Sequence, residues 1–134
     1  MQFKNISIEI LVRGDYQACY DFYTEKLGFV PTWGDRNGPY TAFAMEAGGE
    51  TCFSISAADN LKTLKGYVQP ETKAQPDTIL GTIYSKDIEA DYRKMKEAGV
   101  EFVCELQHIA AFDATQAYFR DPEGNLFALY QTVE

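Results

Sequence analysis

An internal repeat with a spacing of 71 to 72 residues constrains the fold more than any other feature of this chain. Asp15 and Asp87 stand 72 residues apart, and Gly28 and Gly99 stand 71 apart. The segments DYQACY and DIEADY begin at the two aspartates. Because these matches fall in nearly one frame, they indicate two copies of one unit, and a unit present only twice excludes a short-period solenoid.

The first copy has the pattern of one strand, one helix and three more strands. Apolar and other side chains alternate over residues 3–12, which is typical of a strand with two unlike faces. Asp15 is placed to cap a helix that runs to about Leu27, where Gly28 ends it. Three short stretches then predict strands over residues 29–33, 40–45 and 51–56.

The second copy repeats this order after a polar, proline-containing segment that runs from residue 57 to about 76. We interpret that segment as a connection or flap. A strand is predicted over residues 78–84, and a helix begins after Asp87 and ends at Gly99. Further strands are predicted over residues 100–104, 114–120 and 126–132.

These patterns predict an α+β fold in one domain of 134 residues. Two tandem βαβββ modules are expected over about residues 1–57 and 77–134, joined by a linker over about residues 58–76. Since each helix covers one face of its sheet, the two sheets are expected to curl into a mixed sheet around a cleft between their uncovered faces. The sequence leaves open whether the modules of one chain pair together or exchange with those of a second chain.

The charge composition excludes some classes of partner. The formal net charge is −8, and the basic residues are scattered, so nucleic acids and anionic membrane surfaces repel the chain. A cationic ligand is favoured instead, although an acidic surface also serves solubility alone. No apolar run approaches the roughly 20 residues that a bilayer-spanning helix needs.

The N-terminal and cysteine patterns predict a cytoplasmic protein. The opening residues MQFK contain no charged-then-apolar leader, so no signal peptide is expected. Cys19, Cys52 and Cys104 form no CxxC pair and lie among apolar residues. This is typical of buried thiols in a reducing compartment rather than of disulfides or a zinc site.

Three segments carry a resemblance to the vicinal oxygen chelate superfamily of glyoxalase I, bleomycin-resistance proteins and extradiol dioxygenases. GDYQACYDFYTEKLGF resembles its D-x₆-FY-x₃-LGF opening, KDIEADYRKMKEAGVEF its second-module helix, and FRDPEGNLFALYQ its closing hairpin. Together they cover most of the chain in the family's order, which implies the glyoxalase/bleomycin resistance fold. The segment CFSISAAD resembles the fourth strand of the metal-free bleomycin-resistance branch, whose members are dimers.

The resemblance also implies four positions at which metal-dependent members hold a divalent ion with His or Gln, Glu, His and Glu. Transferred one at a time, these positions fall at Ser7, near Ser54, near Leu80 and at Ala128. Hydroxyl and hydrocarbon side chains do not supply the anionic or imidazole donors that such an ion needs. We therefore expect no metal and no cofactor.

Aromatic and polar side chains are candidates to contact a ligand in the predicted cleft. Trp33, the only tryptophan, either stacks on a planar ligand or covers the core as a rim residue. Tyr40 is expected to face the cleft, and Phe53 the helix or core. The expected ligand-binding residues are Ser7, Glu9, Trp33, Tyr40, Ser54, His108, Tyr118, Leu126, Ala128 and Tyr130.

Glu9 and His108 are titratable residues with candidate chemical roles. Glu9, in an apolar strand, is a candidate base, a partner for a ligand cation, or a member of a salt bridge at a solvated cleft mouth. His108, the only histidine, lies between two predicted strands, where it is a candidate acid–base group or a solvated loop residue. Asp113 and Tyr118 are further candidates for the cleft, and no catalytic residue is assigned.

These observations favour a metal-free, homodimeric binding protein that holds a small organic molecule, such as a cationic aromatic compound or antibiotic. The alternative is a glyoxalase-, lyase- or isomerase-type enzyme that uses Glu9 or His108 as a base, or a metal enzyme with ligands at other positions. A third interpretation is a structural or regulatory domain with a vestigial cleft.

Overall fold

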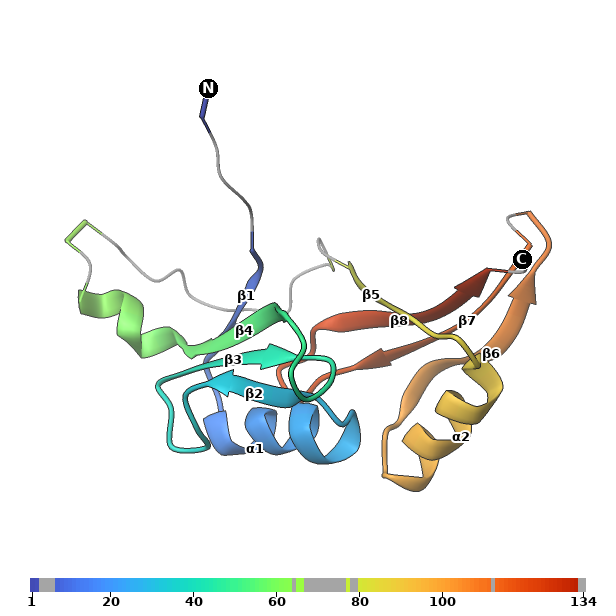
Figure 1. Cartoon of the computed structure of the whole chain (residues 1–134), viewed down its shortest axis with the longest axis horizontal. Helices are drawn as coiled ribbons and strands as arrows, with labels where there is room; N and C mark the ends of the chain where they lie inside the picture. Colours follow the sequence, from blue (N-terminus) through green and yellow to red (C-terminus); the bar gives the residue numbers. More distant parts are fainter. Residues whose placement is uncertain (3–6, 64, 67–76, 78–79, 112, 133–134) are drawn as a thin grey trace. The chain divides into compact units, whose positions relative to one another are not determined.

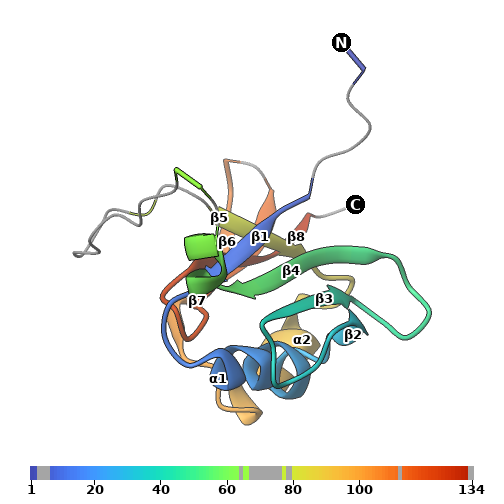
Figure 2. The same ribbon diagram turned by 90° about the vertical axis from the view of Figure 1, so that its left-hand side faces the viewer.

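The computed structural model of the chain describes residues 1–2, 7–63, 65–66, 77, 80–111 and 113–132. The chain divides into two compact units, Met1–Glu71 and Thr72–Glu134 (Figures 1 and 2). Each unit holds one four-stranded mixed sheet and an α-helix, which confirms the α+β fold of two tandem modules. In the described residues, no helix is long and apolar enough to cross a membrane.

The described part of the first unit follows the order strand, helix and three strands. Its main elements are β1 (Glu9–Val12), α1 (Tyr16–Asp21), β2 (Val30–Trp33), β3 (Tyr40–Ala44) and β4 (Thr51–Ala57). Two short helical segments are η1 (Phe22–Lys26), a π-helical continuation of α1, and η2 (Ala58–Thr63), a 3-10 helix. The strands lie in the order β1-β4-β3-β2, with β1 parallel to β4 and the other pairs antiparallel.

Helix α1 begins where the sequence places its cap. The Asp15 carboxylate accepts a hydrogen bond from the Ala18 N–H at 3.1 Å, the arrangement expected of an N-cap aspartate. The helix continues through η1, and Gly28 adopts a φ of +80°, which glycine tolerates. The predicted helix to about Leu27 is thus confirmed, although its second half is π-helical.

Aromatic rings join this helix to one face of the first sheet. The Tyr23 ring centroid lies 4.9 Å from that of Phe53 and 5.9 Å from that of Phe43, and the Phe43 and Phe53 rings stack at 5.2 Å. Phe53 therefore faces the helix, as predicted. The Tyr16 hydroxyl lies 2.6 Å from the Thr41 hydroxyl. Burial raises the pKa of Tyr16, and this hydrogen bond opposes the rise.

The second unit repeats the arrangement of the first. Its elements are β5 (Leu80–Tyr84), α2 (Ile88–Glu97), β6 (Phe102–Ile109), β7 (Ala114–Arg120) and β8 (Leu126–Thr132). The strands lie in the order β5-β8-β7-β6, again with the first strand parallel to the last. The Asp87 carboxylate accepts the Ala90 N–H at 3.2 Å, and Gly99 has a φ of +94° after the helix, both as predicted.

A run of aromatic rings joins α2 to its sheet. The Tyr92 ring centroid lies 4.5 Å from that of Phe102, which in turn lies 5.8 Å from that of Phe119. Phe119 is fully buried and stacks on Phe127 at 5.4 Å with an interplanar angle of 12°. Phe127 therefore marks the face of β8 that α2 covers.

Some predictions about local structure are wrong, and others concern residues outside the described ranges. Strand β6 runs to Ile109, because its pairing with β7 continues to Ala114, so His108 lies within a strand and not between strands. Of the three cysteines, Cys19 is buried, but Cys52 and Cys104 are exposed beside register shifts in their strand pairings. The described part of the first strand begins at Glu9, and residues 3–6 and 67–76 lie outside the described residues.

Loss of the α2 cap should destabilise the protein. Asp87→Ala removes the oxygen that accepts the Ala90 N–H, and the loss of such a cap lowers the free energy of unfolding by about 1 kcal/mol. Asp87→Asn retains a side-chain acceptor and should lose clearly less. Urea denaturation followed by circular dichroism measures both variants, and equal losses would show that the cap hydrogen bond contributes nothing.

Candidate ligand-binding faces

Four side chains form one row across the face of the first sheet that α1 does not cover. Glu9 of β1 stands opposite Ser54 of β4, Ser54 stands opposite Ala42 of β3, and Ala42 stands opposite Trp33 of β2. Residues directly opposite one another share a face of the sheet. Because Phe53, next to Ser54 in the chain, points toward α1, the row points away from it. We call these four residues the first-sheet row.

The row combines small central side chains with larger ones at its ends. Ser54 and Ala42 are only 6% and 5% exposed, whereas Glu9 is exposed and Trp33 is 66% exposed. Glu9 and Trp33 stand on the two edge strands of the sheet. Their strands are three spacings apart, which corresponds to about 14 Å. The row therefore carries a carboxylate at one edge and an indole ring at the other.

A second aromatic ring accompanies Trp33. The Tyr40 ring centroid lies 5.6 Å from that of Trp33, with an interplanar angle of 57°. Tyr40 pairs with Ser56 of β4, so it shares the face of the row and points away from the helix, as predicted. Gly34, with a φ of +80°, follows Trp33, and a Cβ at this position would collide with the Tyr40 carbonyl oxygen. The close approach of the two strands next to the ring pair thus depends on a glycine.

The second sheet has an equivalent face on the side opposite α2. Ala128 of β8 stands between Thr82 of β5 and Tyr118 of β7 in the strand register. Leu126 and Tyr130 alternate with Phe127, so they share the face of Ala128. Four of the five candidate ligand contacts in this unit therefore lie on one face of the sheet, namely Tyr118, Leu126, Ala128 and Tyr130.

Charge at one end of this second face is neutralised by an ion pair. Arg120, which stands opposite Leu126, donates hydrogen bonds of 2.8 and 2.9 Å to the Asp77 carboxylate. These hydrogen bonds hold the pKa of Asp77 below its usual value. Together with Asp77, Arg120 therefore adds no net charge to this end of the second face.

Two expected site residues lie apart from these faces. His108 pairs with Thr115, which in turn pairs with Gln131, whose side chain reaches the start of α2. His108 therefore lies on the helix side of the sheet, away from Tyr118, and its Nε2 is 2.9 Å from the Asp113 carboxylate. Ser7 is exposed and precedes β1, so the strand register does not fix its direction.

The resemblance implies metal ligands near Ser54, near Leu80 and at Ala128, and none of these three side chains is a good metal donor. Ser54 has Glu9 beside it, whereas Leu80 and Ala128 offer only hydrocarbon. One carboxylate and serine hydroxyls do not make the donor set of a divalent ion. Within the described ranges, no group of three or more His, Cys, Asp and Glu side chains lies together in a way that could hold a metal. These residues do not fit a metal site.

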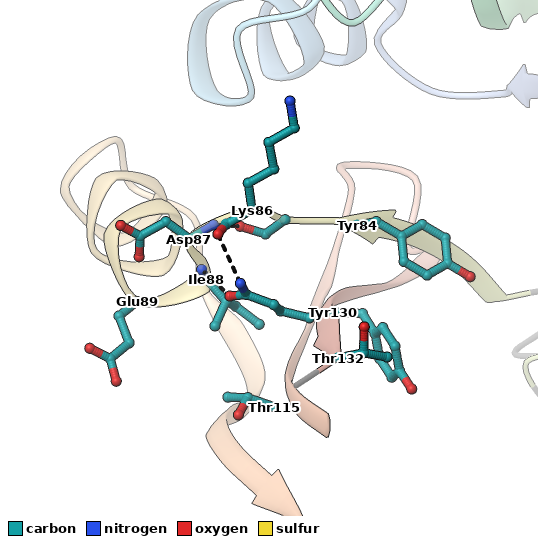
Figure 3. A pocket seen from close by; sticks show the side chains of 10 residues that line it. Tyr84, Lys86, Asp87, Ile88, Glu89, Thr115, Tyr130 and Thr132 are labelled. Carbon is teal, nitrogen blue, oxygen red and sulfur yellow. Dashed lines mark hydrogen bonds between the residues drawn. The ribbon is translucent and has the colours of Figure 1, made fainter. Parts of the chain in front are cut away.

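A pocket of about 770 Å³ lies in the second unit, beside the start of α2 and the ends of β5 and β8 (Figure 3). Of its lining residues, the sequence predicts Tyr130 as a ligand contact, in the cleft between the modules, but predicts no such role for Tyr84 or Gln131. The direction of Tyr84 could have been predicted, because it continues the strand alternation through Leu80 and Thr82. No local sequence pattern could have predicted the hydrogen bond of Gln131, because its partner Ile88 is 43 positions away in the chain. The lining residues are Tyr84, Ser85, Lys86, Asp87, Ile88, Glu89, Thr115, Tyr130, Gln131 and Thr132.

Comparison with known proteins places this geometry in a family. Residues 6–129 match the family model described as Glyoxalase/Bleomycin resistance protein/Dioxygenase superfamily. A Bacillus subtilis (strain 168) protein, named Uncharacterized protein YraH, is 26% identical over 132 residues, which cover 97% of this chain and 99% of that protein.

Solved structures show the same fold. A glyoxalase/bleomycin resistance protein/dioxygenase from Nocardioides matches with a TM-score of 0.75 and 18% identity, over 100% of this chain and 87% of that one. A glyoxalase/bleomycin resistance protein/dioxygenase family enzyme from Burkholderia phytofirmans PsJN matches with a TM-score of 0.71 and 18% identity, over 95% and 97% of the two chains. At these identities the likeness establishes the fold and not the activity.

Substitution of Gly34 tests its role beside the Trp33–Tyr40 pair. Gly34→Ala places a methyl group against the Tyr40 carbonyl oxygen, so it should lower the free energy of unfolding by more than about 2 kcal/mol and shift the Trp33 emission. Gly48→Ala is the matched control, since Gly48 has a φ of +77° but a Cβ there meets nothing within 4 Å. It should cost only about 1 kcal/mol. Urea denaturation measures the free energy of unfolding of both variants. Equal losses would show that the backbone at Gly34 moves away from the Tyr40 carbonyl oxygen at no cost in stability.

Proposed function

This chain belongs to the Glyoxalase/Bleomycin resistance protein/Dioxygenase superfamily, and from that premise we propose that it is a metal-free protein that binds a small organic cation with a planar ring. In this proposal the ring lies against Trp33 and Tyr40, and the cationic group lies beside Glu9. The observation that carries it is the strand register, which sets the carboxylate of Glu9 and the indole of Trp33 at the two ends of one row.

Charge supports the cationic part of the ligand. The chain has a formal net charge of −8, and Glu9 is the charged member of the first-sheet row. Because Glu9 is exposed, an ion pair with it is worth only about 0–1 kcal/mol. Glu9 therefore selects the sign of the ligand's charge more than it supplies binding energy.

Aromatic surface supplies most of the affinity. Trp33 is 66% exposed and already contacts the ring of Tyr40, so a third ring can join the pair with little rearrangement. Contacts between aromatic rings are worth about 0.5–1.5 kcal/mol beyond the burial of area. The apolar area itself contributes about 25 cal/mol for each Å² removed from water.

The geometry of the row also selects the length of the ligand. Glu9 and Trp33 stand on strands that are about 14 Å apart, so a compact cation cannot contact both side chains. Ser54 and Ala42 have short side chains, which leave space above the centre of the row for an aliphatic linker. The ligand should therefore be extended, with its ring and its charge separated by about 10 Å.

The metal-free part of the proposal is supported by the chemistry of the side chains. The resemblance implies metal ligands near Ser54, near Leu80 and at Ala128, and none of these three residues is a good donor. Binding in this chain would accordingly rely on the rings and on Glu9.

Dansylcadaverine tests the proposal, because it carries a planar ring and an ammonium group joined by a flexible linker of suitable length. Its binding should produce energy transfer from Trp33, the only tryptophan in the chain, to the dansyl ring. Trp33→Ala should weaken binding about tenfold, as measured by dansyl anisotropy. The absence of both energy transfer and an anisotropy change would refute the proposal.

A double-mutant cycle tests the ion pair with Glu9 separately from the ring contact. Glu9→Gln and N-acetylation of the probe should each weaken binding about threefold, and their combination should cost no more than either change alone. Glu25→Gln, an exposed acid on η1 and so on the helix side of the unit, is the matched control and should have no effect. If Glu9→Gln weakens the charged and acetylated probes equally, Glu9 does not contact the cation.

A further inference from the structure

The pocket at the start of α2 is built by a set of polar contacts that hold its walls in place. The Gln131 side chain accepts the Ile88 N–H at 2.8 Å and donates to the Lys86 carbonyl oxygen at 2.8 Å. These hydrogen bonds, drawn as dashed lines in Figure 3, fasten the end of β8 to the connection between β5 and α2. Ser85 donates to Asp91 at 2.6 Å within the same connection. The pocket is therefore preformed, and a ligand would not have to order it.

Aromatic rings form one side of this pocket. Tyr84 and Tyr130 meet edge to face, with centroids 5.7 Å apart and an interplanar angle of 83°. Tyr84 is 74% exposed, so much of its ring surface is free for another planar group. Figure 3 shows both tyrosines on one side and Asp87 and Glu89 on the other.

Hydroxyl groups of the lining are available to a ligand. Gln131, Ser85 and Asp87 already hydrogen-bond to other groups in this unit. By contrast, the side-chain hydroxyls of four lining residues make no hydrogen bond in the described part of the chain, namely Tyr84, Tyr130, Thr115 and Thr132. Such groups can both donate and accept, so they suit a ligand with polar substituents.

The charges around the pocket largely offset one another. Lys86 opposes Asp87 and Glu89, and the start of α2 contributes about half a positive charge. The Asp87 carboxylate is also engaged by the Ala90 N–H. Neither a strongly anionic nor a strongly cationic ligand is favoured here, which distinguishes the pocket from the row that contains Glu9.

We propose that this pocket is a second small-molecule site, specific for an uncharged planar heteroaromatic ring that carries hydrogen-bonding substituents. The ring stacks on the exposed ring of Tyr84 and meets Tyr130 edge to face, and its substituents reach the hydroxyls of Tyr84, Tyr130 and Thr132, which share this face of the sheet. The volume of about 770 Å³ lies within the range of small-molecule sites, about 300–1,000 Å³. Every lining residue of this pocket belongs to the second unit, whereas the first-sheet row belongs to the first.

Three probes that share one pyridine ring test the site and its charge preference: nicotinamide, nicotinate and the N-methylpyridinium analogue of nicotinamide. Heteronuclear NMR of the whole protein should show that nicotinamide, at millimolar concentration, shifts the amide signals of Ile88, Gln131 and Thr132. The anionic and cationic analogues should bind at least about tenfold more weakly. The absence of shifts with nicotinamide, or equal shifts with a charged analogue, would overturn the proposal.

Substitutions of the two tyrosines test which side chains contact nicotinamide. Tyr84→Ala should weaken nicotinamide binding about threefold to tenfold without loss of fold, since Tyr84 is 74% exposed. Tyr130→Phe removes only a hydroxyl and should weaken binding about threefold. Tyr20→Phe, in α1 of the first unit, is the control and should leave the nicotinamide titration unchanged. Unchanged binding in both pocket variants, or equal weakening in Tyr20→Phe, would refute the assignment.

Discussion

The contact of Tyr23 with the stacked rings of Phe43 and Phe53 determines what each residue of the first sheet can do. Side chains alternate along a strand, so once these two phenylalanines face the helix, their neighbours must face away from it. A slip of one residue in β1 would turn Glu9 to the helix-facing side of the sheet, where the aromatic rings lie. The aromatic contact thus fixes the positions of the polar side chains that make the candidate site.

In the second unit, ring contacts between the helix and the sheet also fix which side chains face away from the helix, but with different residues. Phe102, Phe119 and Phe127 face α2, and the register then turns Tyr118, Ala128 and Tyr130 to the opposite side. Duplication has therefore preserved the packing of a helix on a sheet while the uncovered faces have diverged. One face carries a carboxylate and an indole ring at its two edges. The other carries hydroxyl groups and a guanidinium that Asp77 engages.

Much of this architecture could be predicted because its signals are local. Asp15, Asp87 and Gly28 act within one helical turn, and strand alternation gave the direction of Tyr130 correctly. The pairing of Glu9 with Ser54 joins residues 45 positions apart, so alternation could not show that they are neighbours. The extent of β6 depends on its pairing with β7, which is why His108 was predicted in a loop. The Gln131 bridge depends in the same way on contacts that are distant in the chain.

Two side chains at positions where the resemblance implies metal ligands are small and buried. Ala128 is only 2% exposed and stands between Thr82 and Tyr118 in the register, and Ser54 is 6% exposed. A glutamate in place of Ala128 would bury a carboxylate whose register neighbours carry no positive charge, at a cost of several kcal/mol. A metal could offset that cost only if the other donors were present, so a single substitution cannot restore the site. In the first-sheet row, Ser54 instead places a small buried side chain next to Ala42, so in the proposed binding mode the edge residues Glu9 and Trp33 distinguish one ligand from another.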